Sequence, residues 1–311
     1  MSWIDDLPAG YRGWRTWQAT TDGRLEVFCC RGRSAGPMAL ITAGVHGDEY
    51  EGPAGIFSLA RTLSPDHLQG TVIAVPVINP EAFAAGTRLH PKDGANLART
   101  FPGNGNGGPT EQLAGAVFQE LVAPANYVID LHSGGVEYIF VPVAGFYGDA
   151  ASANQSFQAA TSFGLPVLWK LPPTKGVLSY EAWRRDKIAI GAEYGGAGQL
   201  SPDGAQDYCA GILGCLAHWG MLASVSEDRR DAAVVEGDWQ LASASGIFVA
   251  SCGLGDAVRE NTVVASIVGP RGETVQEFTV SSEGMILGLR SKAYIRAGDW
   301  AVLVGKRVEV D

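Results

Sequence analysis

MALITAGVHGDEYEGPAGIFSLARTL, residues 38–63, joins an apolar run to a helical segment through a turn crowded with polar groups. The run at 38–45 predicts a buried strand, and the apolar spacing at 51–63 predicts a helix. His46 and Glu49 stand three residues apart between the two, and glycines flank them. Because glycine permits tight turns and close approach of a ligand, we interpret this turn as a candidate binding site.

The same alternation of strand and helix continues along the chain. Apolar, β-branched runs at 71–79, 127–132 and 188–195 predict further buried strands, and helical spacing recurs at 110–122 and 207–222. Continuous apolar strands separated by helices are typical of sheets that are covered on both faces. We therefore predict an α/β fold with a mixed, largely parallel sheet flanked by helices.

The character of the chain changes after the last of these helices. A polar, charged stretch is followed by short alternating strands such as GIFVAS and WAVLVG, broken by Gly and Asp. We predict one domain over residues 1–225, a linker over 226–235 and a small, all-β C-terminal domain over 236–311.

Composition narrows the classes of partner and the compartment. The net charge of −10 argues against binding to nucleic-acid phosphates or an anionic membrane surface. The N-terminus shows no basic leader or apolar signal region, and no run approaches eighteen apolar residues. The five cysteines form no C-x-x-C pair, as expected of reduced thiols. We expect a cytoplasmic protein whose partner is a small molecule. The sequence leaves open whether the chain forms a homo-oligomer.

Polar side chains follow several of the predicted strands. His46 and Glu49 follow the first, His132 ends another, and Glu193 lies within a fourth. Ligands of such sheets bind beyond the carboxyl ends of the strands. Two histidines and a carboxylate can bind zinc and leave a position for water, with Glu193 free as a base. Each residue alone is weak evidence for a metal site, since H-x-x-E is frequent by chance and lone histidines are usually structural.

Three other residues are candidates for supporting roles. Asp130 precedes His132 by two, so on a strand it shares a face with it and could orient a ligand imidazole; capping of a neighbouring backbone group is the alternative. Arg88 and Arg99 lie in segment 79–103, whose weak periodicity predicts no regular element. Such arginines are usually solvated, but beside a metal one could steady an oxyanion and the other could grip a carboxylate.

Four motifs in order give the chain a resemblance to a known family. GVHGDEYEG, NPEAF…TR…NLARTFPG, DLHSGG and AEYGG resemble the succinylglutamate desuccinylase and aspartoacylase family of zinc carboxypeptidase-like hydrolases. Within it they look closest to the bacterial N-acetyl-diaminobutyrate deacetylases of ectoine degradation. The resemblance covers nearly the whole chain and implies a mixed sheet with helices, followed by a β domain that narrows the entrance of the site.

The resemblance also implies roles for individual residues. It implies one zinc ion per chain, held by His46, Glu49 and His132. Glu193 matches the general base and proton shuttle, Arg88 the arginine that polarises the scissile carbonyl, and Arg99 the arginine that binds the substrate carboxylate. Asn96 and Tyr294 are further candidates for substrate binding, with a buried structural tyrosine as the alternative for Tyr294.

One position departs from the family pattern. The family usually has an asparagine directly before the second arginine, where this chain has Ala98. Loss of that hydrogen-bond donor should weaken recognition of the usual substrate by about 1–3 kcal/mol, or indicates a different substrate.

The sequence therefore predicts a zinc-dependent deacylase that hydrolyses a linear amide of an N-acyl amino acid or a related small molecule. The substrate is expected to carry an amide and a carboxylate. The alternatives are a carboxypeptidase, a deacylase of a modified peptide or specialised metabolite, and a non-catalytic binding protein on the same fold.

Overall fold

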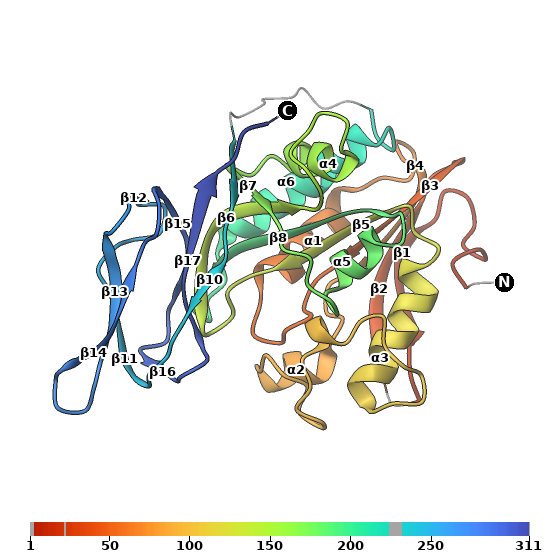
Figure 1. The fold of residues 1–311 in the computed structure, drawn as a ribbon. Helices are drawn as coiled ribbons and strands as arrows, with labels where there is room; N and C mark the ends of the chain where they lie inside the picture. Colours follow the sequence, from red (N-terminus) through yellow and green to blue (C-terminus); the bar gives the residue numbers. More distant parts are fainter. Residues whose placement is uncertain (1–2, 22, 224–231, 311) are drawn as a thin grey trace.

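Four parallel strands form the centre of the computed structural model, which describes residues 3–21, 23–223 and 232–310 (Figure 1). They pair in the order β4-β3-β5-β8. Their bounds are Gln69–Val75 for β4, Ser34–Thr42 for β3, Tyr127–His132 for β5 and Ile188–Gly196 for β8. The apolar runs at 38–45, 71–79, 127–132 and 188–195 thus mark all four strands of this centre.

Antiparallel strands extend this centre on both sides, so the sheet is mixed. At one edge β4 pairs with β2 (Arg24–Arg31), which pairs with β1 (Arg12–Gln18). On the other side β8 pairs antiparallel with β6 (Tyr138–Phe146), and β6 pairs parallel with β7 (Val167–Lys170). The mixed sheet is as predicted. Its parallel pairs are confined to its middle, to β6 with β7, and to β7 with β9 (Ala233–Glu236).

Helices cover both faces of the central part of the sheet, which is why its four central strands are rich in apolar residues. One apolar core includes residues of α1 (Glu51–Thr62), α4 (Gln155–Phe163) and α6 (Pro202–His218). The other includes residues of α3 (Pro109–Val117), the π-helical turn η2 (Phe118–Val122) and α5 (Leu178–Trp183). In Figure 1, α4 and α6 lie above the central strands and α3 lies below them.

Two helix starts differ from our expectations because side-chain caps decide them. α6 begins at Pro202, before the predicted 207, since Ser201 accepts a hydrogen bond from the Gly204 amide. Segment 79–103, where we expected no regular element, forms α2 (Pro80–Ala85), capped by Asn79, and the 3₁₀ turn η1 (Leu97–Arg99). Helices of six and three residues are too short to show the 3.6-residue periodicity by which helices are predicted.

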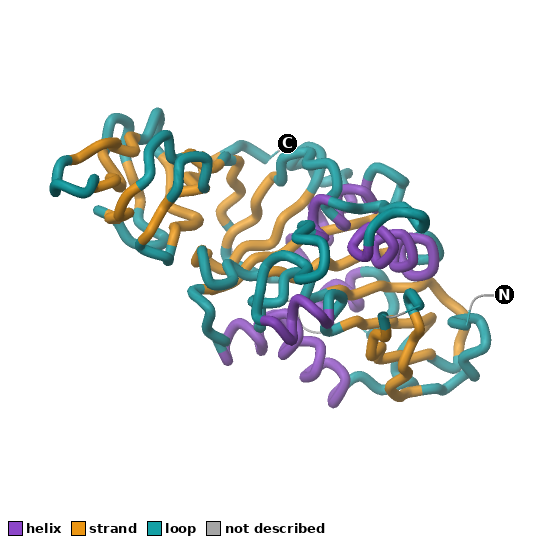
Figure 2. The backbone as a smooth tube through the Cα atoms, turned by 90° about the horizontal axis from the view of Figure 1, so that it is seen from below, coloured by secondary structure: helices purple, strands orange, loops and turns teal. Residues whose placement is uncertain are grey.

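The C-terminal strands join the central sheet through a closed ring of strands. β7 pairs with β9 (Ala233–Glu236), β9 with β17 (Trp300–Arg307), β17 with β15 (Gly284–Arg290), and β15 returns to β6. A third apolar core fills this ring, and it includes Phe140, Trp169 and Leu303. Figure 2 shows the strands running without interruption from the central sheet into the C-terminal region.

The remaining C-terminal strands form the β region predicted at this end of the chain. β14 (Thr274–Thr279), β13 (Val263–Val268), β11 (Gly246–Ala250) and β16 (Tyr294–Ile295) make a second sheet. β10 (Trp239–Leu241) pairs with β17, and β12 (Ala257–Val258) pairs with β15.

The division of the chain into domains stays a prediction. Of the predicted linker, residues 226–231 lie outside the described residues, and β9 begins at Ala233. Among the described helices, none is long and apolar enough to cross a membrane.

The turn after β3 depends on close approach to α2, which gives a test of the fold. A Cβ at Gly47 would overlap the backbone carbonyl of Ala82, whereas a Cβ at the exposed Gly105 would meet nothing within 4 Å. We expect Gly47→Ala to lower the free energy of unfolding by about 1–3 kcal/mol. Gly105→Ala should leave it nearly unchanged. Equal urea midpoints for the two variants would contradict this packing.

Candidate active site

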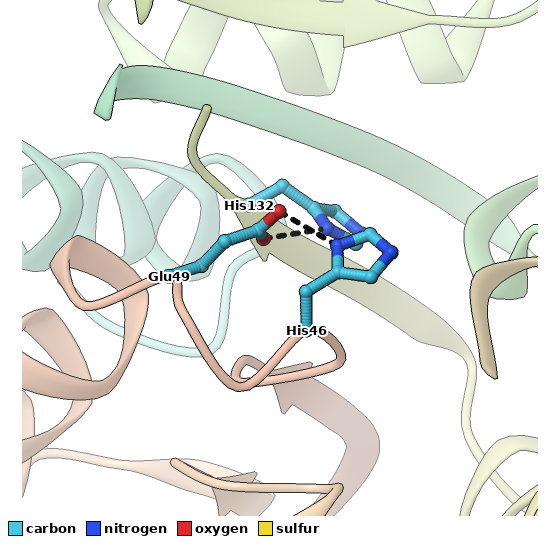
Figure 3. A group of neighbouring side chains, drawn as sticks. All are labelled: His46, Glu49 and His132. Atoms are coloured by element: carbon cyan, nitrogen blue, oxygen red, sulfur yellow. Dashed lines mark hydrogen bonds and ion pairs between the residues drawn. The ribbon is translucent and has the colours of Figure 1, made fainter. Parts of the chain in front are cut away.

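Three side chains meet beyond the carboxyl ends of β3 and β5. His46 and Glu49 lie in the loop between β3 and α1, and His132 is the last residue of β5. Figure 3 shows the three side chains pointing toward one another, two from one loop and one from the neighbouring strand. In the register of β5 and β8, His132 lies opposite Glu193. The parallel pairing therefore brings together residues that are up to 147 positions apart in the sequence.

The Glu49 carboxylate lies between the two imidazoles. Its Oε1 is 2.6 Å from His46 Nδ1, and its Oε2 is 3.1 Å from His132 Nδ1. The backbone amide of Ser133 also donates to Oε2, at 3.2 Å. One ligand atom from each of the three residues lies within 4.8 Å of the others, and all three residues are buried. Two imidazole nitrogens and a carboxylate in this arrangement could hold a metal ion.

The outer nitrogens of both imidazoles have oxygen partners. His132 Nε2 is 3.1 Å from Asp130 Oδ2, and Thr42 donates to the other oxygen of Asp130 at 2.8 Å. His46 Nε2 is 3.1 Å from Asn96 Oδ1. Such partners fix an imidazole's tautomer and leave its other nitrogen free for a metal. The structure thus places Asn96, predicted to bind substrate, against His46.

The other acidic residues of the loop have different partners. Asp48 Oδ2 accepts a hydrogen bond from the Val136 amide at 2.8 Å, and Glu51 Oε1 accepts one from the Ser201 amide at 3.1 Å. Both carboxylates are buried and hold neighbouring loops in place. Of the three, only Glu49 belongs to the His–Glu–His group.

Burial and charge shift the pKa values in this group. Burial acts to raise the pKa of Glu49, but His46 and His132 outweigh it and hold the pKa below its usual range. Burial acts to lower the pKa of His132, and Asp130 and Glu49 raise it well above the usual value. Burial, with help from Arg88, lowers the pKa of His46. The group is therefore arranged around a negative carboxylate.

Glu193 has a different environment. Its Oε2 atom is shielded from solvent and has no hydrogen-bond partner among the described residues. Burial raises the pKa of Glu193 to about 8, against the lowering effect of His132 and with a further rise from Glu49. A carboxyl group whose pKa lies close to neutral pH can both accept and release a proton, as general acid–base catalysis requires.

Two arginines reach the same cavity from the segment after α2. Arg88 donates from Nη1 to Glu49 Oε1 at 3.1 Å, and its side chain is 24% exposed. Arg99, the last residue of η1, donates to the Ala98 carbonyl at 2.8 Å, and its guanidinium lies over the Trp300 ring, 5.9 Å from its centre. Both side chains can therefore offer N–H groups to a bound anion or carbonyl.

These groups line a cavity of about 370 Å³. His46, His132, Glu193 and the two arginines form its polar end, and Ala98 also borders it. Tyr294 is not among the lining residues; it lies on β16 and is 53% exposed.

The sequence reasoning missed most of the remaining wall. The missed lining residues are mainly apolar or aromatic: Phe140, Val143, Tyr147, Trp169, Leu171, Trp239 and Trp300. In sequence they are indistinguishable from core residues of strands, so no local signal marks them.

Comparison with known proteins agrees with this geometry. The family model described as the succinylglutamate desuccinylase/aspartoacylase catalytic domain matches residues 35–219. The chain is 31% identical to the N-alpha-acetyl-L-2,4-diaminobutyric acid deacetylase of Halomonas elongata, over 89% of this chain and 84% of that protein. The matched region contains both histidines and both glutamates of the site.

Solved structures resemble the whole chain. The product-bound ectoine utilization protein EutE (DoeB) from Ruegeria pomeroyi has a TM-score of 0.86 at 28% identity, with 96% of each chain covered. A succinylglutamate desuccinylase/aspartoacylase from Rhodobacter sphaeroides has a TM-score of 0.87 at 25% identity, with 97% of each covered. The similarity includes the C-terminal strands, since nearly all of this chain is aligned.

The raised pKa of Glu193 predicts a pH-dependent cost to stability. A folded-state pKa near 8 against an ordinary value of 4.5 means that the stability gained by protonation is full below pH 4.5 and is lost as the pH rises through 8. Glu193→Gln cannot ionise. In chelator-treated protein we therefore expect this variant to be more stable than wild type at pH 9, by on the order of 1–3 kcal/mol, but not at pH 5.

Thermal unfolding between pH 5 and pH 9 measures this difference. The exposed Glu277→Gln is the matched control, and we expect its difference from wild type to stay constant. A constant difference for Glu193→Gln as well would show that the carboxyl group is not destabilised by burial.

Proposed function

We propose that this chain, which belongs to the succinylglutamate desuccinylase/aspartoacylase family, is a zinc-dependent deacylase of an N-acyl amino acid or a related small molecule. Its curated relative is named as a deacetylase of an N-acetylated diamino acid. The observation that carries the proposal is the buried group of His46, Glu49 and His132 beside Glu193, in a cavity that two arginines also line.

The donor set fits zinc. Two neutral imidazoles and one carboxylate are ligands that catalytic zinc sites use, and they leave one position open. Both imidazoles turn Nδ1 toward the centre and engage Nε2 with Asn96 or Asp130. The pKa of Glu49, held low by the two histidines, keeps this carboxylate ionised at neutral pH. We propose one zinc ion per chain, held by these three residues.

A zinc ion in this position would supply Lewis acidity, lowering the pKa of a water toward 7 and polarising a carbonyl. Glu193 would accept the proton of the attacking water at its shielded Oε2 and pass it to the leaving amine. The atom is suited to this because none of the described residues forms a hydrogen bond with it, so it is free to accept a proton. We therefore propose that Glu193 transfers this proton.

The two arginines would position the substrate. Arg88 touches Glu49, so its guanidinium lies beside the metal group and can donate to the oxygen of the scissile carbonyl as negative charge develops there. Arg99, whose guanidinium lies over the Trp300 ring, can bind a carboxylate of the substrate through two parallel N–H groups. The spacing of the two arginines would select substrates that carry both an amide and a carboxylate.

Ala98 affects the identity of the substrate and leaves the proposed zinc chemistry unchanged. It is buried, and it borders the cavity with a methyl group where the family usually has an asparagine. A panel of Nα-acetyl-diaminobutyrate, N-succinylglutamate and short peptides would separate a deacylase from a carboxypeptidase, which should prefer the peptides.

Removal of the metal is the first test of this function. We expect dialysis against a chelator to abolish amide hydrolysis and equimolar zinc to restore it, because the ion supplies the Lewis acidity. Metal analysis should give about one zinc per chain in wild type and far less in His132→Ala. Hydrolysis that persists in metal-free protein would refute the proposal.

Substitution of the base is the second test. We expect Glu193→Gln to lower kcat by about 10²- to 10⁴-fold, since the amide cannot accept the proton of the water. Zinc content should stay at the wild-type level because Glu193 is not a proposed ligand. Turnover within threefold of wild type on a substrate that wild type cleaves would show that another group is the base.

A further inference from the structure

Much of the cavity wall away from the metal group is apolar, with Thr174, Ser179 and Asp238 as its polar residues, and nothing in the proposed reaction requires so much apolar surface. The apolar residues of this wall are Phe140, Val143, Trp169, Leu171, Trp239 and Trp300. An acetyl group would offer this wall a single methyl. Since apolar surface is stabilised by apolar contact, the wall indicates a larger occupant.

The aromatic side chains are held in place by one another and by the ring of strands. Trp239 and Trp300 are stacked, with ring centres 5.3 Å apart and planes inclined by 9°. Phe140 meets Trp239 edge-on at 5.6 Å. The three residues come from β6, β10 and β17, which are linked through the paired strands of the ring. The wall is therefore pre-formed, and binding would not have to order it.

One glycine leaves room beside Glu193, namely Gly191, whereas the side chain of Leu171 already fills the space that a Cβ at Gly145 would take. Gly145 on β6 and Gly191 on β8 lie opposite each other, and both line the cavity. A Cβ at Gly191 would be 3.5 Å from Leu171 and 3.6 Å from Ser179, which are ordinary contacts. Packing therefore does not force glycine at position 191. Its missing side chain instead enlarges the space on the same face of the strand as Glu193.

Charge favours a neutral occupant over a cation. The guanidinium of Arg99 already lies over the Trp300 ring, and Arg88 lines the same cavity. A further cation would be repelled by both arginines, and Asp238 is, among the described residues, the one carboxylate beside the aromatic residues that would attract it. Ala98 adds a methyl group where a hydrogen-bonding side chain would serve a polar substrate.

We propose that the substrate carries a bulky, neutral, apolar group, aromatic or branched aliphatic, in addition to the amide and carboxylate, and that this group binds between Gly191 and the Trp239–Trp300 stack. This inference rests on the amide hydrolysis proposed above. The group could belong to the acyl half or to the side chain of the amino acid, because both halves meet at the scissile bond beside Glu193.

Two matched pairs of substrates test the proposal and identify the half. N-acetyl-L-alanine is compared with N-benzoyl-L-alanine, which enlarges the acyl group, and with N-acetyl-L-phenylalanine, which enlarges the side chain. We expect kcat/KM to rise at least tenfold in one of the two comparisons, since each methylene in a hydrophobic pocket contributes on the order of tenfold. Nα-acetyl-diaminobutyrate represents the cationic occupant. If it, or N-acetyl-L-alanine, matches both bulky compounds, the proposal is wrong.

Variants of the wall provide an independent readout in the ratio of bulky to small substrate. We expect Trp300→Ala to lower this ratio at least fivefold, and Gly191→Ala to lower it by a smaller factor because its methyl group narrows the space. Trp14→Ala, at an exposed tryptophan on β1, and Gly105→Ala are the matched controls and should leave the ratio unchanged. A ratio that moves equally in control and wall variants would overturn the assignment.

Binding separates failure of this inference from failure of the proposed reaction. Calorimetric titration of the zinc-loaded Glu193→Gln protein with the same compounds needs no turnover. If no compound is hydrolysed by wild type but the bulky ones bind at least tenfold more tightly than N-acetyl-L-alanine, the apolar site stands and the reaction does not. Equal affinities would overturn the apolar site whatever the activity.

Discussion

The buried carboxylate of Glu49 is the group on which the rest of the site depends. A buried, ionised carboxylate costs several kcal/mol unless it has charged or hydrogen-bonding partners. Here the partners are His46, His132, Arg88 and the Ser133 amide. They come from the ends of β3 and β5 and from the segment after α2, which meet only because the two strands are parallel and adjacent.

The histidines that contact this carboxylate are in turn held by further hydrogen bonds. His132 needs an acceptor for its other nitrogen, and Asp130 on the same strand face supplies it, held in turn by Thr42 on β3. The carbonyl of His132 accepts a hydrogen bond from the hydroxyl of the buried Tyr208 on α6, at 2.6 Å. A helix that covers the sheet thus fixes the backbone of His132. The geometry of the site therefore depends on how this helix packs in the core.

The site was more predictable from sequence than the cavity. The strands before His46 and His132 are long apolar runs, and the polar residues that follow them are conspicuous for that reason. β1, at the edge of the sheet, and β2, beside it, contain exposed residues among their apolar ones. The long apolar run that marks the central strands is therefore missing from their sequence. The wall of the cavity could not be predicted because Trp239 and Trp300 meet only through pairing of β10 with β17, a contact between distant segments.

The polar and the aromatic parts of the cavity come from different parts of the fold. Its polar end comes from the central sheet and its loops, whereas much of its aromatic wall comes from the closed ring β6-β7-β9-β17-β15 and from β10. Because backbone hydrogen bonds run around the whole ring, Trp300 is held relative to Glu193 by continuous strand pairing. A side chain on the ring can therefore change without displacing His46, Glu49 or His132. The shape of the cavity can therefore vary through the ring while the His–Glu–His group stays in place.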